Sequence, residues 1–372
     1  MAEDKGPFAT DQEPARRGSP RLSAVSCRLS ADAGAASYAG IEAWLAKADR
    51  TLRVGLLSHQ AALLSTGETS AQACRRIFGA NLRALFGPEH GYFGVAAAGE
   101  RTASATHPLW GIPVHSLYGQ HRKPTAEMLA GLDLLIVDLQ DLGVRCYTYL
   151  ATLLLTLEAC AEAHLPCLVC DRPIPWHTVE DGPVAEPEHF SFVAPCALPL
   201  VHGRLPTEIA AWSGLPHLAA PMTAPCPPFE RPPVPEFIPP SPAIRLWETA
   251  RIYPATVFAE ALPQLDIARA TAYAFRVLSA PWLEGERLAA ELNEREFPGI
   301  TFHDFTQAPG QGALRLHVTN PVTFRPWAVT CALLQTLHRR YGPERLFAHP
   351  QARPEWMTKL CGTEVWRAEL SR

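Results

Sequence analysis

Short apolar runs alternate with longer amphipathic segments in the first half of the chain. LRVGLLSH, LRALFG, DLLIVDLQ and PCLVCD are apolar on both faces, which is typical of strands buried in a parallel sheet. AQACRRIFG, PTAEMLAGL and YTYLATLLLTLEACAEA have the pattern of helices, and Pro124 stands where one helix begins and Gly214 where another ends. This alternation predicts an α/β fold with a Rossmann-like, mostly parallel sheet domain over residues 36–215.

The pattern changes after this region. Residues 216–255 are rich in proline, which supports neither a long helix nor a central strand, so we expect a connector between two domains. Residues 256–372 contain the helical segments LEGERLAAELNE and PWAVTCALLQTLHRRYG and the strand-like segments ITFHDF and LRLHVTN, with a terminal helix after Pro354. They predict a smaller α+β domain. Residues 1–35 show neither the periodicity of a helix nor that of a strand, and we expect a disordered tail there.

Composition excludes several classes of function. The 372 residues are 47% hydrophobic and 19% charged, which suits two soluble domains. The formal net charge of −4 and the absence of a basic cluster argue against a nucleic-acid partner. Because the sequence has neither a run of about eighteen apolar residues nor a signal-peptide pattern, we expect no membrane association and a cytoplasmic location. A misassigned start that hides an export signal is the alternative, with a secreted or periplasmic protein, and the oligomeric state stays open.

The ten cysteines are scattered through apolar stretches and lack the spacing of a disulfide framework. We therefore expect reduced, buried thiols. Cys167 and Cys170 form a C-x-x-C inside a predicted buried strand, where alternation directs the two side chains to opposite faces. This placement argues against a redox pair or a zinc site.

Polar residues follow four predicted strands, at the positions where open α/β sheets bind ligands. They are Glu89 and His90 after LRALFG, Asp138, Gln140, Asp141 and Arg145 at DLLIVDLQ, Asp171 and Arg172 after PCLVC, and His202 after ALPLV. We expect them to converge on one rim of the sheet. Several carboxylates, two arginines and two histidines there suit general acid/base chemistry on a polar substrate such as a sugar.

Structural roles are the alternative for several of these residues. An Asp after a strand often caps the next helix, and a nearby Arg often pairs with it, so Asp138, Asp141 and Asp171 each have this second interpretation. His90 and His202 also suit structural roles by spacing alone. Glu89 differs, because the proline and glycines around it form no helix that it caps. Position alone thus makes Glu89 the strongest candidate for chemistry.

We expect neither a metal nor a nucleotide cofactor. A metal site formed by His90, Asp138 and His202 has no paired-ligand spacing to support it. The chain has no G-x-G-x-x-G after a strand and no G-x-x-x-x-G-K-[ST]. It also has no G-x-S-x-G, which argues against a serine nucleophile.

A series of motifs runs from about Ile41 to the C-terminus, namely FGPEHGYFG, AGE, PVHSLYG, GLDLLIVDLQDLGVRCYTYLATL, DRPIP, EDGPVAEP, LPLVHGRLPTEIA and SAPWLEGERLAAELN. In this order they resemble the NamZ exo-β-N-acetylmuramidase family, formerly a domain of unknown function. The resemblance implies a Rossmann-like domain, a smaller C-terminal domain and an active site in the cleft between them. It further implies a bacterial cell-wall hydrolase that releases non-reducing-end N-acetylmuramic acid from peptidoglycan fragments without metal or nucleotide.

The resemblance also assigns roles to individual residues. Glu89 of PEHG would be the catalytic acid/base, and Glu100 of AGE a neighbouring carboxylate in the cleft. Either Glu180 or Asp181 takes the place of the family's E-G-P glutamate. Because the following Gly-Pro anchors this motif, we expect Asp181 to be the second catalytic carboxylate.

The resemblance also implies which residues contact the substrate. Arg145, Arg172 or His202 would hold the lactyl carboxylate that distinguishes muramic acid from glucosamine. Tyr147, in the YTY run after Arg145, and Arg269, retained in a later motif, are further substrate-binding candidates.

The C-terminal motifs depart from the family pattern. P-S-P-N is Pro240-Ser241-Pro242-Ala243 here, E-G-T-N is reduced to Glu260-Ala261-Leu262-Pro263, and Ile267 replaces an acidic residue before Arg269. Two alternatives therefore stay open beside hydrolysis with Glu89 as the acid: a carbohydrate-binding relative without activity, and a glycosidase with a different amino-sugar substrate. The orientation of Asp266, into the cleft or toward solvent, discriminates between them.

Overall fold

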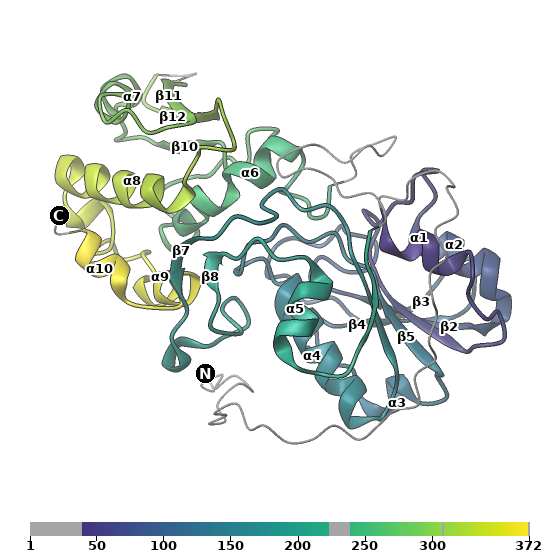
Figure 1. The fold of residues 1–372 in the computed structure, drawn as a ribbon. Coiled ribbons are helices and arrows are strands. Elements are labelled where there is room, and N and C mark those ends of the chain that lie inside the picture. Colours follow the sequence, from purple (N-terminus) through teal and green to yellow (C-terminus); the bar gives the residue numbers. More distant parts are fainter. Residues whose placement is uncertain (1–38, 223–238, 307–308, 371–372) are drawn as a thin grey trace.

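The computed structural model describes residues 39–222, 239–306 and 309–370. Figure 1 shows a larger N-terminal region with a central sheet and a smaller C-terminal region, coloured green to yellow. The tail expected over residues 1–35 and the central part of the proline-rich stretch, residues 223–238, lie outside the described residues. The proposed domain limits of 36–215 and 256–372 stay a prediction.

A seven-stranded sheet in the order β3-β4-β2-β1-β5-β6-β9 forms the centre of the N-terminal region. Its strands are β1 (Val54–Leu57), β2 (Leu82–Gly87), β3 (Ala105–Thr106), β4 (Pro113–Ser116), β5 (Leu134–Val137), β6 (Cys167–Cys170) and β9 (Leu218–Ala220). All neighbours run parallel except β3, which pairs antiparallel with β4. The predicted Rossmann-like, mostly parallel sheet is confirmed.

Helices cover both faces of this sheet, which explains why its strands are apolar on both sides. They are α1 (Gly40–Leu45), α2 (Ser70–Phe78), α3 (Ala126–Leu129), α4 (Tyr149–Glu162) and α5 (Pro206–Ser213). One apolar cluster joins α1 and α2 to one face, and another joins α4 and α5 to the other. Cys167 belongs to the α4 side and Cys170 to the α2 side, so the expected divergence of the C-x-x-C pair is confirmed.

The ALPLV segment forms a strand outside the main sheet, contrary to our expectation. Strand β8 (Pro199–Val201) pairs antiparallel with β7 (Asp181–Val184) in a separate two-stranded sheet. The loop after β5 also bonds to it, because the Arg145 nitrogen donates to the Leu200 oxygen at 2.8 Å. The prediction that His202 lies on the rim of the main sheet is therefore wrong.

The C-terminal region is α+β, as predicted. Its antiparallel sheet has the order β10-β12-β11, with β10 (Val277–Ala280), β11 (Ile300–Asp304) and β12 (Gly312–Val318). The helical elements are α6 (Trp247–Thr256), η3 (Val257–Ala261), α7 (Gly285–Asn293), α8 (Pro326–Tyr341), α9 (Pro354–Cys361) and α10 (Val365–Glu369). Among the described residues, no helix combines the length and apolar character needed to cross a membrane.

Two elements lie within the stretch that we expected to carry no long helix or strand. The edge strand β9 and the start of α6 both use its proline-free parts, since no proline occurs between Ala243 and Tyr253. Pro254 stands in the last turn of α6, where it removes one helical hydrogen bond. This stretch therefore contains a short strand at the sheet edge and most of a ten-residue helix, and its role as a connector between two domains stays a prediction.

Candidate active site

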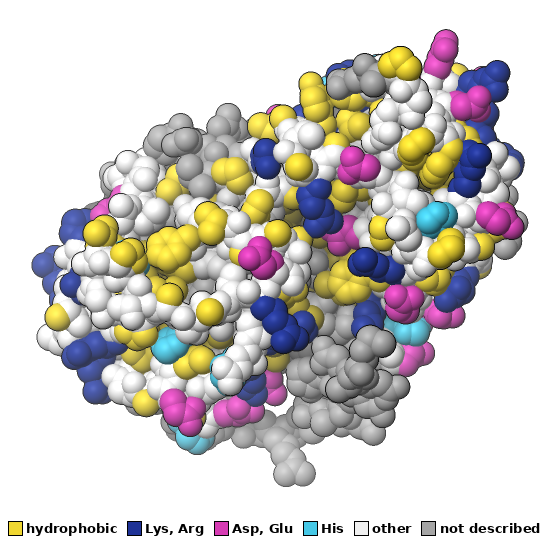
Figure 2. Space-filling model, turned by 180° about the vertical axis from the view of Figure 1, so that it is seen from behind, with side chains coloured by type: hydrophobic (Ala, Val, Ile, Leu, Met, Phe, Trp, Pro, Cys, Tyr) yellow, Lys and Arg dark blue, Asp and Glu magenta, His cyan; other side chains and the backbone are white. Residues whose placement is uncertain are grey.

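A cavity of about 710 Å³ lies between the two regions of the molecule. From the N-terminal region it is lined by residues that include Glu89, His90 and Tyr147, and from the C-terminal region by residues that include Glu260, Arg269 and Trp356. Figure 2, seen from behind, shows the surface hollowed between the two regions, with acidic and basic side chains beside apolar ones. The cleft implied by the family resemblance is thus present.

Glu89 enters the cavity from the loop that follows β2. A Cβ atom at Gly87 would lie 2.4 Å from the Tyr92 nitrogen, so only glycine lets the next residues fold back on the strand. His90 and Gly91 complete the turn with φ angles of 72° and 75°, in the left-handed region. The turn places Glu89 at the carboxyl edge of the sheet, buried except for the side that faces the cavity.

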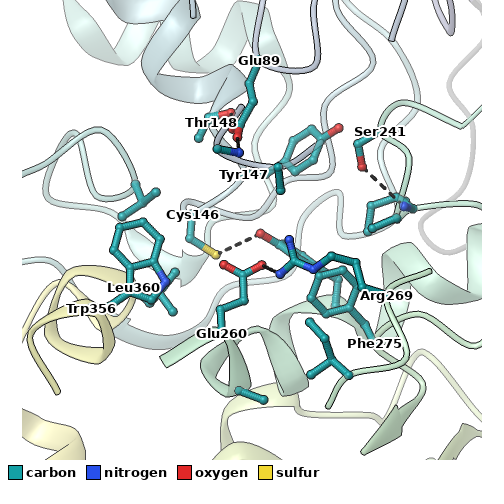
Figure 3. Close-up of a pocket in the computed structure, with 18 of the residues that line it drawn as sticks. Glu89, Cys146, Tyr147, Thr148, Ser241, Glu260, Arg269, Phe275, Trp356 and Leu360 are labelled. Carbon is teal, nitrogen blue, oxygen red and sulfur yellow. Dashed lines mark hydrogen bonds and ion pairs between the residues drawn. The ribbon is translucent and has the colours of Figure 1, made fainter. Parts of the chain in front are cut away.

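Two hydrogen bonds fix the orientation of the Glu89 carboxyl group. Its Oε1 accepts from the Gly99 nitrogen at 2.7 Å, and its Oε2 accepts from the Thr148 hydroxyl at 2.6 Å. Figure 3 shows Glu89 and Thr148 together at one side of the cavity. A carboxyl group held by a backbone amide and a rotatable hydroxyl is well suited to transfer a proton in a fixed direction.

His90 lies in the same cavity, and its ring is held by the backbone. Its Nδ1 lies 2.9 Å from the Ala96 oxygen, so Nδ1 carries a proton and donates it to this oxygen. Burial lowers the pKa of His90, although the nearby Glu89 carboxylate acts in the opposite direction. His90 thus holds the loop beside Glu89, and burial disfavours a positive charge on its ring.

The opposite wall holds a second carboxylate that sequence reasoning did not place in the site. Glu260, in η3, forms an ion pair with Arg269 at 2.7 Å, and both line the cavity with Glu89. Burial raises the pKa of Glu260, and Arg269 counteracts this shift. The signal was present in the sequence, because Glu260 is the retained first residue of the reduced E-G-T-N motif.

Tyr147 and Asp266 also line this cavity. The Tyr147 hydroxyl is buried and has no hydrogen-bond partner among the described residues. Asp266 is exposed at the cavity, and its Oδ1 accepts from the Ala268 nitrogen at 3.0 Å. Asp266 therefore shapes the turn before Arg269, and its orientation alone does not separate hydrolysis from binding.

Asp138, Asp171 and Arg172 lie at the carboxyl edge of the sheet but do not line the cavity. Arg172 forms a fully buried ion pair with Asp138 at 2.7 Å and also donates to the Ser70 hydroxyl, at the start of α2. Asp171 accepts from the nitrogen and hydroxyl of Thr207, in the first turn of α5. Both arrangements match the structural alternative, in which the Asp caps a helix or pairs with an Arg.

Gln140 and Asp141 shape the loop after β5 and do not line the cavity. Gln140 donates to the Pro173 oxygen at 2.7 Å. Asp141 Oδ1 accepts from the nitrogens of Leu142 and Gly143, while burial raises the pKa of its carboxyl group to about 6. The two residues hold the loop that leads to Tyr147.

Arg145 is buried in a position that does not line the cavity. Its guanidinium group donates to four backbone oxygens, those of Pro183, Leu198, Leu360 and Cys361. These bonds connect the two-stranded sheet to α9 of the C-terminal region. Arg145 therefore fastens the two regions together, and its hydrogen-bonding groups are not directed at a substrate.

Asp181, His202 and Glu100 also lie outside the cavity lining. Asp181 accepts from the Trp327 nitrogen at 2.8 Å, which caps the first turn of α8. His202 and Glu180 line a separate, smaller cavity of about 410 Å³. Glu100 is exposed and accepts from the Ala97 nitrogen within its own turn. The structure thus favours Glu260 over Asp181 as the carboxylate opposite Glu89.

The fold and the cavity define a class of protein, a two-region α/β protein in which carboxyl groups from both regions line a shared cavity. The family model "Exo-beta-N-acetylmuramidase NamZ, N-terminal" matches residues 54–223, and its C-terminal counterpart matches residues 251–372. The chain is 33% identical over 311 residues to the peptidoglycan beta-N-acetylmuramidase NamZ of Bacillus subtilis, covering 78% of this chain and 73% of that protein. The chain belongs to the exo-beta-N-acetylmuramidase NamZ family.

Two solved structures of DUF1343 family proteins from Bacteroides fragilis are similar to this one. The first is 26% identical with a TM-score of 0.80, over 90% of this chain and 91% of that chain. The second is 22% identical with a TM-score of 0.67, over the same shares of the two chains, and supports the fold alone. These similarities agree with the two-region architecture.

Proposed function

We propose that this protein is a glycosidase that releases N-acetylmuramic acid from the non-reducing end of peptidoglycan fragments, with Glu89 as its catalytic acid. Membership of the family supports the reaction, and the Bacillus subtilis relative is named for its action on peptidoglycan. The observation that carries the assignment of Glu89 is its placement, buried against a cavity between the two regions with its carboxyl group held by Gly99 and Thr148.

Hydrolysis of a glycoside needs an acid that protonates the leaving oxygen and a group that stabilises the oxocarbenium-like transition state. Glu89 has the first role. Glu260, on the opposite wall, supplies a negative charge for the second; burial raises the pKa of Glu260, and its pairing with Arg269 opposes this shift and favours the ionised form. The substrate's own acetamido group is a second source of this stabilisation, in which case Glu260 acts electrostatically.

A carbohydrate-binding relative without activity is the competing function. The replacement of the family's asparagine by Ala243, which lines the cavity, removes one amide that bonds a sugar hydroxyl. The carboxylates on both walls are nevertheless retained, and they are the groups that the acid and the charge-stabilising role of a glycosidase require. This retention favours hydrolysis, with the altered wall affecting the choice of sugar.

The test compares the wild-type protein with Glu89→Gln on a nitrophenyl β-N-acetylmuraminide, by release of the chromophore. We expect the substitution to lower kcat by about 10²- to 10⁴-fold, the usual contribution of a general acid. Glu158→Gln is the matched control, because Glu158 is a partly exposed residue of α4 that pairs with Lys123 away from the cavity. Full turnover by Glu89→Gln would overturn the assignment, and a wild type that binds the muraminide without cleaving it would support the binding protein.

A further inference from the structure

Muramic acid differs from glucosamine by a lactyl ether that ends in a carboxylate, and an arginine beside the sugar is the strongest partner for this group. Three residues expected to provide this cation do not line the cavity. Arg145 donates to backbone oxygens, Arg172 is paired with Asp138, and His202 borders the smaller cavity. The charge must therefore come from another residue.

The basic residues that line the cavity, among those the structure describes, are His90, Arg269 and Arg353. His90 is less suitable, because its Nδ1 proton is used toward the Ala96 oxygen and burial disfavours a positive charge on the ring. Arg353 is exposed at the start of α9, and its described hydrogen bond is made by its backbone nitrogen. Arg269 is the better candidate because its side chain is already ordered.

The position of Arg269 is fixed by several contacts. The backbone turn before it has Ala268 at φ 53°, stabilised by the Asp266 carboxylate. The guanidinium group lies 5.6 Å from the centre of the Phe275 ring and bonds Glu260 through Nη2. Figure 3 shows Arg269 reaching into the cavity across from Glu89.

This arrangement leaves hydrogen-bonding capacity for a ligand. A guanidinium group has five N–H donors, and the described contacts with Glu260 use one of them. Three carboxylates line the cavity, Glu89, Glu260 and Asp266, so an anionic substituent would be repelled without a cation beside it. A guanidinium held in place also loses little side-chain entropy when it binds.

We propose that Arg269 binds the carboxylate of the substrate's lactyl ether and so determines the preference for muramic acid over amino sugars that lack this group. The inference rests on the proposed function and adds the residue that selects its substrate. Glu260 then has two roles, since it faces the reacting sugar and holds Arg269 in the orientation that the lactyl group requires.

The experiment uses two substrates that differ only in charge, the nitrophenyl muraminide and its lactyl methyl ester. For Arg269→Met, we expect kcat/KM on the acid to fall by about 10- to 100-fold, as for the loss of a charge-assisted hydrogen-bonded pair. The loss should be mainly in KM when it is measured above the acidic limb of the kcat profile, where Glu260 is ionised with or without Arg269. Activity on the ester should change much less, so that the preference for the acid disappears, and Arg269→Lys should restore part of it.

Arg276→Met is the matched control. Arg276 belongs to the same segment and lies 5.9 Å from the centre of the Tyr273 ring, but it does not line the cavity. Equal losses on acid and ester, or an unchanged preference in Arg269→Met, would overturn the inference. If the wild type cleaves neither substrate, the proposed function fails first, and calorimetric binding of N-acetylmuramic acid and its methyl ester to wild type and Arg269→Met still decides the role of Arg269.

Discussion

Two arginine–carboxylate pairs of the same length lie in the two regions of this molecule, one away from the cleft and one in its wall. Arg172 and Asp138, at the edge of the N-terminal sheet, are 2.7 Å apart with side-chain exposures of 3% and 0%. Arg269 and Glu260, in the C-terminal wall, are also 2.7 Å apart but have exposures of 38% and 19%. Distance therefore does not distinguish a structural pair from a functional one, whereas access to the cavity does.

The surroundings of the pairs explain the difference. The donors of Arg172 are used by Asp138, Ser70 and the Leu63 oxygen, so the first pair connects β5, the loop after β6 and the start of α2. In the second pair, the described bond to Glu260 uses one donor of the Arg269 guanidinium group, and Arg269 lines the cavity. A ligand has access to the second pair only.

The largest expected effect is a loss of stability when the buried Arg172–Asp138 pair is broken. Asp138→Asn leaves the buried Arg172 without a counter-charge, and we expect the free energy of unfolding to fall by about 3–5 kcal/mol. Urea unfolding followed by circular dichroism measures this change. Asp133→Asn is the control, because it breaks an exposed pair with Arg53 and should change stability little. A loss no greater than that of the control would contradict the structural role of the buried pair.

A smaller effect, on activity, should follow at the other pair. We expect Glu260→Gln to lower kcat by about 10²- to 10³-fold, the usual scale for one group that stabilises a transition-state charge. Initial rates on the nitrophenyl muraminide measure it, with Glu248→Gln as a control at an exposed position of α6. If Glu260→Gln keeps the wild-type rate, the substrate's acetamido group supplies the stabilisation without Glu260.

The smallest effect concerns pH. Burial raises the pKa of Glu260 and Arg269 lowers it, so Arg269→Met should raise this pKa further. Glu260 is needed in its ionised form, hence activity is lost as the pH falls through its pKa, and the acidic limb of the kcat profile should move to higher pH. Arg269→Lys retains a positive charge and should shift the acidic limb less. An acidic limb that stays in place in Arg269→Met would mean that another group controls it.

The sequence predicted the sheet well because strands buried on both faces have a clear apolar pattern. It predicted β8 wrongly, because a three-residue apolar run does not reveal which strand it will pair with. The carboxyl-edge rule placed Asp138 and Asp171 correctly at the edge of the sheet. It could not show that their side chains turn toward Ser70 and Thr207, away from the cavity.

Part of the candidate site could also be predicted from the sequence. The PEHG motif marks Glu89 because its proline and glycines fix a turn. Arg269 was also a substrate-binding candidate because its motif is retained, whereas Glu260 was not assigned to the site. Both come from a region about 170 residues further along the chain, and the packing of the two regions brings them to the same cavity as Glu89. The motif that contains Glu180 and Asp181 suggested the second carboxylate, but Asp181 caps α8 and neither residue lines the cavity.

The hydrogen bonds of Arg145 affect the order in which the parts of this protein assemble during synthesis. Two of the oxygens that accept from its guanidinium group belong to Leu360 and Cys361, and the same helix contributes Trp356 to the cavity. During translation the Rossmann-like region emerges first, with this buried cation still short of its last acceptors. The cleft is therefore assembled only when residue 361 has left the ribosome, and a nascent chain halted earlier carries Glu89 without a finished site around it.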